Sequence, residues 1–174
     1  MPKNALLLKI ISIFLALALT ISCNPQPEEI ELSFETIEQE DMSVPSGVYK
    51  DHPEIILISS KIEMIRLENL IGEQSIMTLE QISYSDYFGV VVFQGRMPSS
   101  GYGVNLDRIT RVGNIISVFA QFIEPEYEQI VLDIITSPYQ VVRVKKGEGE
   151  WGQDMVVNLI VDNSIVASTN YFIP

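Results

Sequence analysis

Apolar residues beyond the first thirty positions of the chain come in short runs, many of which alternate with polar residues. The runs are rich in Ile and Val, and Gly, Pro, Asn, Asp and Ser separate them, which is typical of β-strands joined by turns. The pattern therefore predicts a mainly β, single antiparallel domain, sandwich-like or barrel-like, from Ile30 to Pro174. The predicted strands are Ile30–Ile37, Glu54–Ser59, Phe88–Gln94, Tyr102–Arg111, Ile115–Ile123, Gln129–Thr136, Tyr139–Val144, Met155–Val161 and Ile165–Phe172.

Three of these runs have a period of two, so their alternate side chains would share one face of a strand and enter the core. Turn residues that tolerate positive φ lie between consecutive runs, at Gly113-Asn114 and at Asp162-Asn163-Ser164, and they predict two hairpins. The predicted core residues are Ile116, Val118, Ala120 and Phe122, then Ile130, Leu132 and Ile134, and finally Val157, Leu159 and Val161.

One short helix is predicted over Lys61 to Leu70. Ser60 followed at the third position by Glu63 matches a capping box, and Gly72 is placed to end the helix. The next segment, Glu73 to Tyr87, fits either a short helix or a loop.

The N-terminus has the layout of a secretory signal, with Lys3 and Lys9 before the apolar run Ile10–Ile21. That run has 12 residues, whereas a membrane-spanning helix needs about 20, so a cleaved signal over residues 1–22 is the better interpretation. Thr20-Ile21-Ser22-Cys23 resembles the bacterial lipobox, although Thr20 departs from the usual aliphatic residue. The resemblance implies lipidation of Cys23, followed by a polar tether over residues 23–29. We therefore expect a lipid-anchored protein of the bacterial cell envelope, held to the membrane outside the cytoplasm.

The chain carries 23 acidic and 11 basic residues, a formal net charge of −12. This charge opposes binding to phosphate backbones, so no nucleic-acid partner is expected. With one cysteine and one histidine, the chain cannot form an internal disulfide or a Cys/His zinc cluster. We expect neither a cofactor nor a metal.

Catalytic signals are weak. His52 lies in a charged segment that is interpreted as an exposed loop, and no G-x-S-x-G motif is present. Glu124, Glu126 and Glu128 cluster in one connection, but the EF-hand spacing is absent. An acidic loop of this kind is usually only solvated, so the chain is predicted not to be an enzyme.

Two turn-rich loops are more specific. Pro and Gly fix turns, while tyrosine gives a large contact surface at low entropic cost, so these loops are candidate protein-binding sites. The alternative is that Tyr102 and Tyr139 plug the ends of the sandwich. The candidate residues are Pro98, Ser99, Ser100, Gly101 and Tyr102 in the first loop, and Ser137, Pro138 and Tyr139 in the second.

The same motifs support a family resemblance over about residues 88–146. A hydrophobic strand ending at Gln94, then Pro98–Tyr102, a hairpin near Gly113, and Thr136–Tyr139 followed by Gln140–Val144 resemble the C-terminal domain family of the protease complex subunit PrcB. The resemblance implies a small, β-rich, non-catalytic domain found in exported bacterial lipoproteins. In the protein that names the family, this domain supports a surface protease complex. The chain departs from the family by continuing into an additional C-terminal hairpin over residues 152–174.

A weaker resemblance gives the alternative function. Met97–Tyr102 is similar by residue class to a loop of the chagasin-like inhibitors of papain-type proteases, which insert loops into the protease cleft. Their glycine-rich second loop and R-P-W third loop have no good match here. The first expectation is thus an accessory or protein-binding lipoprotein whose unknown partner is a protease or another protein, and the second is a protease inhibitor using loops 97–102 and 136–139.

Overall fold

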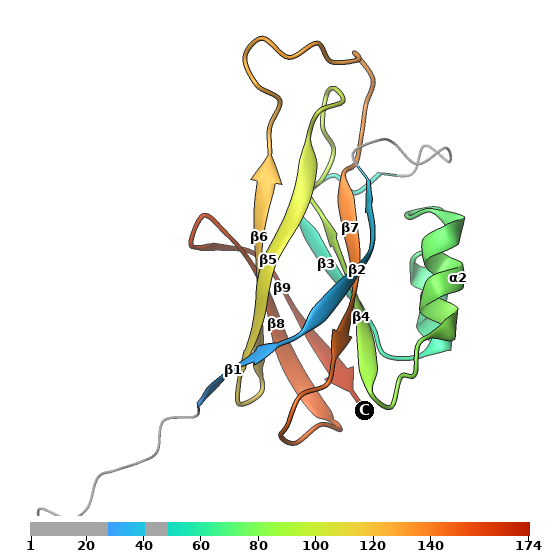
Figure 1. Cartoon of the computed structure of the whole chain (residues 1–174), viewed down its shortest axis with the longest axis vertical. Helices are drawn as coiled ribbons and strands as arrows, with labels where there is room; N and C mark the ends of the chain where they lie inside the picture. Colours follow the sequence, from blue (N-terminus) through green and yellow to red (C-terminus); the bar gives the residue numbers. More distant parts are fainter. Residues whose placement is uncertain (1–27, 41–48) are drawn as a thin grey trace, which may run out of the picture.

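The computed structural model describes residues 28–40 and 49–174, whose strands form two sheets (Figure 1). The five-stranded sheet has the order β1-β5-β6-β8-β9, and the four-stranded sheet has the order β2-β7-β4-β3. The first consists of β1 (Glu29–Leu32), β5 (Gly103–Val112), β6 (Ile115–Ile123), β8 (Gln153–Val161) and β9 (Ser164–Ile173). The second consists of β2 (Phe34–Glu40), β3 (Glu54–Ile58), β4 (Tyr87–Phe93) and β7 (Tyr139–Lys145). The mainly β, sandwich-like prediction is confirmed, and the two sheets do not close into a barrel.

One pair of strands departs from the predicted antiparallel arrangement. β6 and β8 are parallel, with Ile116 opposite Val157 and Val118 opposite Leu159. The reason is the connection between them, because the chain leaves β6 for the other sheet, runs through β7, and returns before β8 begins. Parallel neighbours require such a crossover and cannot be joined by a tight turn.

The main core lies between the sheets and follows the predicted alternation in two of three runs. Ile116, Val118 and Ala120 of β6 are buried, as are Val157, Leu159 and Val161 of β8. Phe122 is only partly buried at the edge of this core. The outer faces of these strands are more exposed, which explains the alternating pattern.

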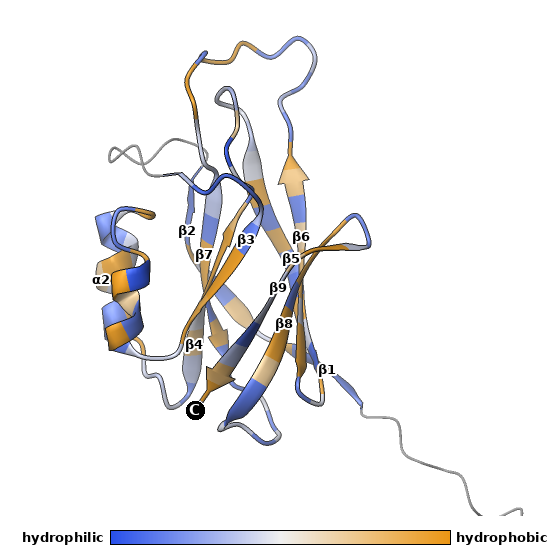
Figure 2. Ribbon diagram, turned by 180° about the vertical axis from the view of Figure 1, so that it is seen from behind, coloured by the Kyte–Doolittle hydropathy of each residue, from blue (hydrophilic) through white to orange (hydrophobic). Residues whose placement is uncertain are grey.

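A second core lies on the outer face of the four-stranded sheet, where the helices pack. The middle of β4 is buried on both faces, because Val90 and Val92 point into the main core while Val91 and Phe93 point toward the helices. A strand that is buried on both faces has a continuous run of apolar residues in its sequence. The neighbouring strand β3 has the same character, and Figure 2 shows it as one hydrophobic run.

The helical region differs from the prediction at its end. The capping box of Ser60 and Glu63 is present, but it begins a 3-10 helix, η1 (Lys61–Arg66), that does not continue to Leu70. Asn69 has a φ of 63°, which is incompatible with a continuing helix. Gly72 then begins the α-helix α2 (Glu73–Gln81) instead of ending the first helix.

The predicted strand Gln129–Thr136 is wrong, because these residues form part of the loop between β6 and β7. The two predicted hairpin turns are confirmed, with positive φ at Gly113, Asp162 and Asn163. The predicted strand Ile30–Ile37 is divided at Ser33, where the chain passes from one sheet to the other.

The predicted signal sequence, Cys23 and most of the predicted tether lie outside the described residues. Among residues 28–40 and 49–174, no helix has the length and hydrophobicity needed to cross a membrane.

Candidate functional site

Two loops at one end of the sandwich are hydrogen-bonded to each other (Figure 1). They are the β4–β5 loop, residues 94–102, and the β6–β7 loop, residues 124–138. Met97 and Thr136 form an antiparallel bridge, in which the Met97 amide donates to the Thr136 carbonyl at 2.9 Å and the Thr136 amide donates back at 3.0 Å. The two candidate loops identified in the sequence therefore lie side by side.

Further hydrogen bonds extend this junction along the β6–β7 loop. The Ser100 amide donates to the Leu132 carbonyl at 3.0 Å, and the Leu132 amide donates to the Ser100 Oγ at 2.9 Å. The Thr136 hydroxyl donates to the Ser99 carbonyl at 2.8 Å. The Ser99 carbonyl and the amide and hydroxyl of Ser100 thus hold the neighbouring loop, while the Ser99 hydroxyl donates to the Ser100 carbonyl.

Gly101 is required at the centre of this junction. Its φ is +91°, a conformation that side chains rarely adopt, and an added Cβ would lie 3.1 Å from both Pro125 Cβ and Val131 Cγ1. The β4–β5 loop therefore packs directly against the backbone and side chains of the β6–β7 loop.

The supported loop exposes large apolar side chains. Ile130 is 98% exposed and Tyr127 is fully exposed. The prediction that Ile130, Leu132 and Ile134 are core residues is wrong, because all three side chains are exposed. The prediction fails because this segment is a loop outside the sheets. Its alternating apolar side chains therefore do not face a core. Figure 2 shows hydrophobic and hydrophilic stretches in alternation along the loop. We call this set the apolar loop surface; it consists of Tyr127, Ile130, Leu132, Ile134 and Ile135.

Acidic residues are interleaved with the apolar loop surface. Between Ile123 and Thr136 the sequence holds four acidic residues and no lysine or arginine. All four side chains are exposed. We call them the acidic rim; they are Glu124, Glu126, Glu128 and Asp133.

The predicted contact residues of the first loop have unequal access to solvent. Pro98 is exposed, whereas Ser99, Ser100 and Gly101 are half-buried in the junction. Tyr102 is half-buried and lines a shallow hollow with Gln39, Glu40 and Ile123. Pro98 is thus the one exposed residue of this set, and the other four keep only part of their surface accessible to a partner.

The second predicted patch requires a correction, because Ser137, Pro138 and Tyr139 are buried. Tyr139 is 2% exposed and packs in the second core, with its ring centroid 5.8 Å from that of Phe93. It begins β7 in the middle of the four-stranded sheet, where the helices cover it. Tyr139 is therefore a core residue and not a contact residue. It packs beneath the helices, whereas the alternative interpretation of the sequence expected it to plug an end of the sandwich.

The Tyr139 hydroxyl joins the helices to the sheet. It accepts a hydrogen bond from the Gly72 amide at 2.8 Å and donates to Glu38 Oε2 at 3.0 Å. The Ser75 hydroxyl donates to the same carboxylate oxygen. Burial, opposed in part by the Gly72 amide, raises the pKa of Tyr139 far above its usual value, so the phenol stays neutral.

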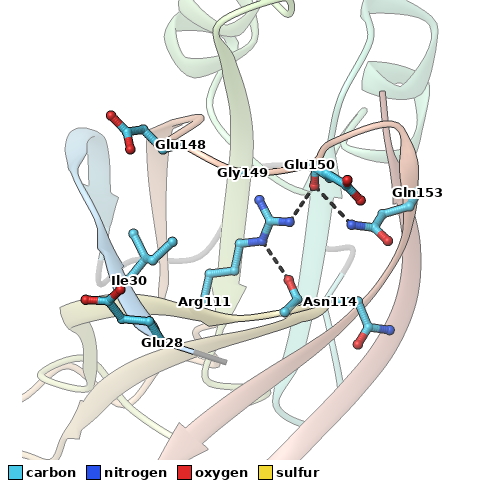
Figure 3. Close-up of a pocket in the computed structure, with 9 residues that line it drawn as sticks. Glu28, Ile30, Arg111, Asn114, Glu148, Gly149, Glu150 and Gln153 are labelled. Carbon is cyan, nitrogen blue, oxygen red and sulfur yellow. Dashed lines mark hydrogen bonds between the residues drawn. The ribbon is translucent and has the colours of Figure 1, made fainter. Parts of the chain in front are cut away.

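A second hollow lies at the end of the sandwich where β1 begins, and Arg111 lines it (Figure 3). The Arg111 guanidinium donates from Nε to the Gly113 carbonyl at 2.8 Å and from Nη2 to the Glu150 carbonyl. Its Cζ lies 4.2 Å from the centroid of the Trp151 ring. In Figure 3 the carboxylates of Glu148 and Glu150 point away from the guanidinium.

This arrangement fits a structural clamp. Arg111 is 4% exposed and holds the loop before β8 against the β5–β6 hairpin, while burial lowers its pKa. Nη1 has no hydrogen-bond partner, and the backbone of Gly149 lies over it.

No cluster of three or more metal-ligating side chains occurs in the described part of the chain. His52 is exposed just before β3. Glu124, Glu126 and Glu128 are all exposed on the β6–β7 loop.

Comparison with known proteins gives one family match. No curated protein and no solved structure matches the chain significantly. Residues 89–145 contain both loops, strands β5 to β7, and all of β4 except its first two residues. This segment matches the family model described as PrcB C-terminal, so the resemblance seen in the sequence is confirmed for it.

Proposed function

We propose that the chain is an exported, lipid-anchored bacterial lipoprotein that acts as a non-catalytic accessory by binding a protein partner through the loop end of its sandwich. The observation that carries the proposal is the apolar loop surface, which is exposed on a loop supported by hydrogen bonds. Large exposed apolar patches on soluble domains usually mark interaction sites, and rigid support lowers the entropic cost of binding.

The family match supports a partner of a particular kind. The PrcB C-terminal family is compatible with an accessory of a protease complex. The matched segment contains the two joined loops, so the part of the chain that carries the resemblance also carries the proposed binding surface. We propose a surface protease complex as the assembly in which the chain takes part.

The position of the loops suits a lipid-anchored accessory. The described chain begins at Glu28, at the end of the sandwich opposite the loops (Figure 1). An anchor at Cys23, five residues earlier, would leave the loop end directed away from the membrane. Cys23→Ala should release the protein from the membrane fraction or block its maturation. Retention of Cys23→Ala with a correctly processed N-terminus would contradict the lipid anchor.

Site-specific photocrosslinking in living cells tests the binding role. A benzophenone amino acid replaces Ile130 in the full chain, and a matched chain carries it at Ile165, which is 62% exposed on the edge strand β9, two strands from β6. We expect a defined protein adduct from position 130 that position 165 does not give. Equal adducts from both positions, or no protein adduct from position 130, would contradict the proposal.

The inhibitor alternative predicts a different property of the same loops. The exposed Pro98 lies beside the β6–β7 loop, as insertion into a protease cleft would require. An inhibitor blocks turnover of its protease, whereas an accessory leaves the bound protease active. Stoichiometric inhibition of papain by the purified domain, lost in Pro98→Asp, would favour the inhibitor.

A further inference from the structure

The loop end combines apolar and acidic side chains in a pattern that restricts what it can bind. Ile130 and Leu132 are 98% and 58% exposed, and Asp133 and Glu128 lie within two residues of them. A partner that covers the apolar side chains must therefore also approach the carboxylates. In a desolvated contact an unpaired carboxylate is costly, so the partner has to supply positive charge beside its apolar surface.

The charges of the loop exclude two other occupants on physical grounds. A second copy of the chain would bring two acidic rims together within a protein of net charge −12, and like charges at an interface oppose association. An anionic lipid surface would repel the same four carboxylates.

We infer that the β6–β7 loop seats in an apolar groove of a protein partner whose margin carries lysine or arginine residues, with Ile130 and Leu132 entering the groove. This inference rests on the proposed function and names the chemistry of its partner. Opposite charges around an apolar centre raise the association rate and fix the orientation of the partner, while the apolar contacts supply most of the affinity.

The hydrogen bonds that hold the β6–β7 loop determine which part of it can enter the groove. The Leu132 backbone is hydrogen-bonded to Ser100, and Glu126 and Gln129 close a turn in which the Gln129 amide donates to the Glu126 carbonyl at 3.0 Å. Ile130 lies between these two fixed points and makes no buried contact of its own. The backbone on both sides of Ile130 is thus held by hydrogen bonds, while the Ile130 side chain stays exposed to a partner.

The test uses the partner protein identified through position 130, purified, with the full chain in detergent. The loop-charge variant carries Glu124→Gln, Glu126→Gln, Glu128→Gln and Asp133→Asn. A control variant carries Glu31→Gln, Glu80→Gln, Asp154→Asn and Asp162→Asn, which replace four exposed acidic residues outside the loop. Both variants therefore have the same net charge. Affinity for the partner is measured at low and at high salt for wild type and both variants.

We expect the loop-charge variant to bind about tenfold more weakly at low salt, and its affinity to change little with salt. Wild type and the control variant should bind alike and should both weaken as salt rises. If both variants bound the partner equally weakly, the affinity would depend only on the net charge of the chain. If the loop-charge variant bound as tightly as wild type, the partner would carry no basic residues beside its apolar groove. Either result would overturn the inference while leaving the proposed binding role intact.

The crosslink itself separates the remaining outcomes. A position-130 adduct mapped to a partner segment rich in lysine or arginine beside apolar residues supports the inference. An adduct to a second copy of this chain, or binding of the purified chain to vesicles of phosphatidylcholine with phosphatidylglycerol that Ile130→Ser abolishes, would overturn it. Absence of any protein adduct at position 130 would instead contradict the proposed function.

Discussion

Replacing Tyr139 by phenylalanine removes one hydroxyl group from the junction between α2 and the four-stranded sheet and leaves the ring in place. That hydroxyl accepts from the Gly72 amide at 2.8 Å and donates to Glu38 at 3.0 Å. The ring remains packed against Phe93. The change therefore tests two hydrogen bonds without opening a cavity in the second core.

The expected loss follows from the partners of the hydroxyl. A hydrogen bond to a charged group contributes about 1.5–3 kcal/mol and a neutral one about 0.5–1.5 kcal/mol. The Glu38 carboxylate keeps its bond from Ser75 and is half-buried, so water replaces part of what it loses. We expect Tyr139→Phe to lower the free energy of unfolding by about 2 kcal/mol. Tyr139→Ala also opens a cavity, and truncation of a large aromatic residue costs about 3–5 kcal/mol.

Urea unfolding of residues 24–174, followed by the fluorescence of Trp151, measures both changes. Tyr127→Phe is the matched control, because Tyr127 is fully exposed and should change stability by less than about 0.5 kcal/mol. The reasoning would be refuted if Tyr139→Phe were as harmless as Tyr127→Phe. It would also fail if Tyr139→Ala kept its stability and lost only partner binding, since that result would assign Tyr139 to a contact surface.

Three further predictions follow from other parts of the structure. Gly101→Ala should lower the free energy of unfolding by about 1–2 kcal/mol, because of its positive φ and the contacts of the added Cβ; a fully stable variant in urea unfolding would contradict the junction. Ile130→Ser should leave the free energy of unfolding within about 0.5 kcal/mol of wild type, because Ile130 has no buried contact; a marked fall in Tm would show that Ile130 packs in the core. Burial raises the pKa of Tyr84 and of Tyr171 to about 12, while the unfolded chain ionises near pH 10, so the free energy of unfolding should decline as pH rises from about 10 to 12. Tyr84→Phe should make that decline less steep, and an unchanged slope in denaturant titrations would argue against a buried phenol.

The fold class was predictable because its main signals are local. In β6 and β8, apolar and polar residues alternate because one face of each strand packs against the core. In β4 the apolar run is continuous because the strand is buried on both faces. The turns at Gly113 and Asp162 need residues that tolerate positive φ, and the sequence supplies them. These features depend on residues close together in the chain.

The errors arise where long-range packing decides the outcome. Residues 129–136 alternate like a strand, yet their pairing is limited to the single bridge between Thr136 and Met97, so they cross the end of the sandwich as a loop. The signals against a strand were the acidic residues around Pro125 and the Asp133 within the apolar run. The parallel pairing of β6 and β8 also depends on which sheet receives β7, which no local pattern encodes.

The candidate site was predictable only in part. Pro98 and Gly101 correctly marked a fixed turn at the loop end, and Thr136 lies opposite Met97. Tyr139 looks like a contact residue in sequence because tyrosine serves equally at interfaces and in cores. Its role is decided by the helices that cover it, and these pack through contacts distant in the chain.

The affinity of the crosslinked partner for two matched variants tests the central claim most directly. Ile130 lies on the loop end, whereas Ile165 is an exposed isoleucine of the β8–β9 hairpin. If the loop end binds the partner, Ile130→Ser should weaken affinity by about tenfold or more, and Ile165→Ser should leave it unchanged. Equal affinity of both variants and wild type would show that the partner binds elsewhere on the molecule.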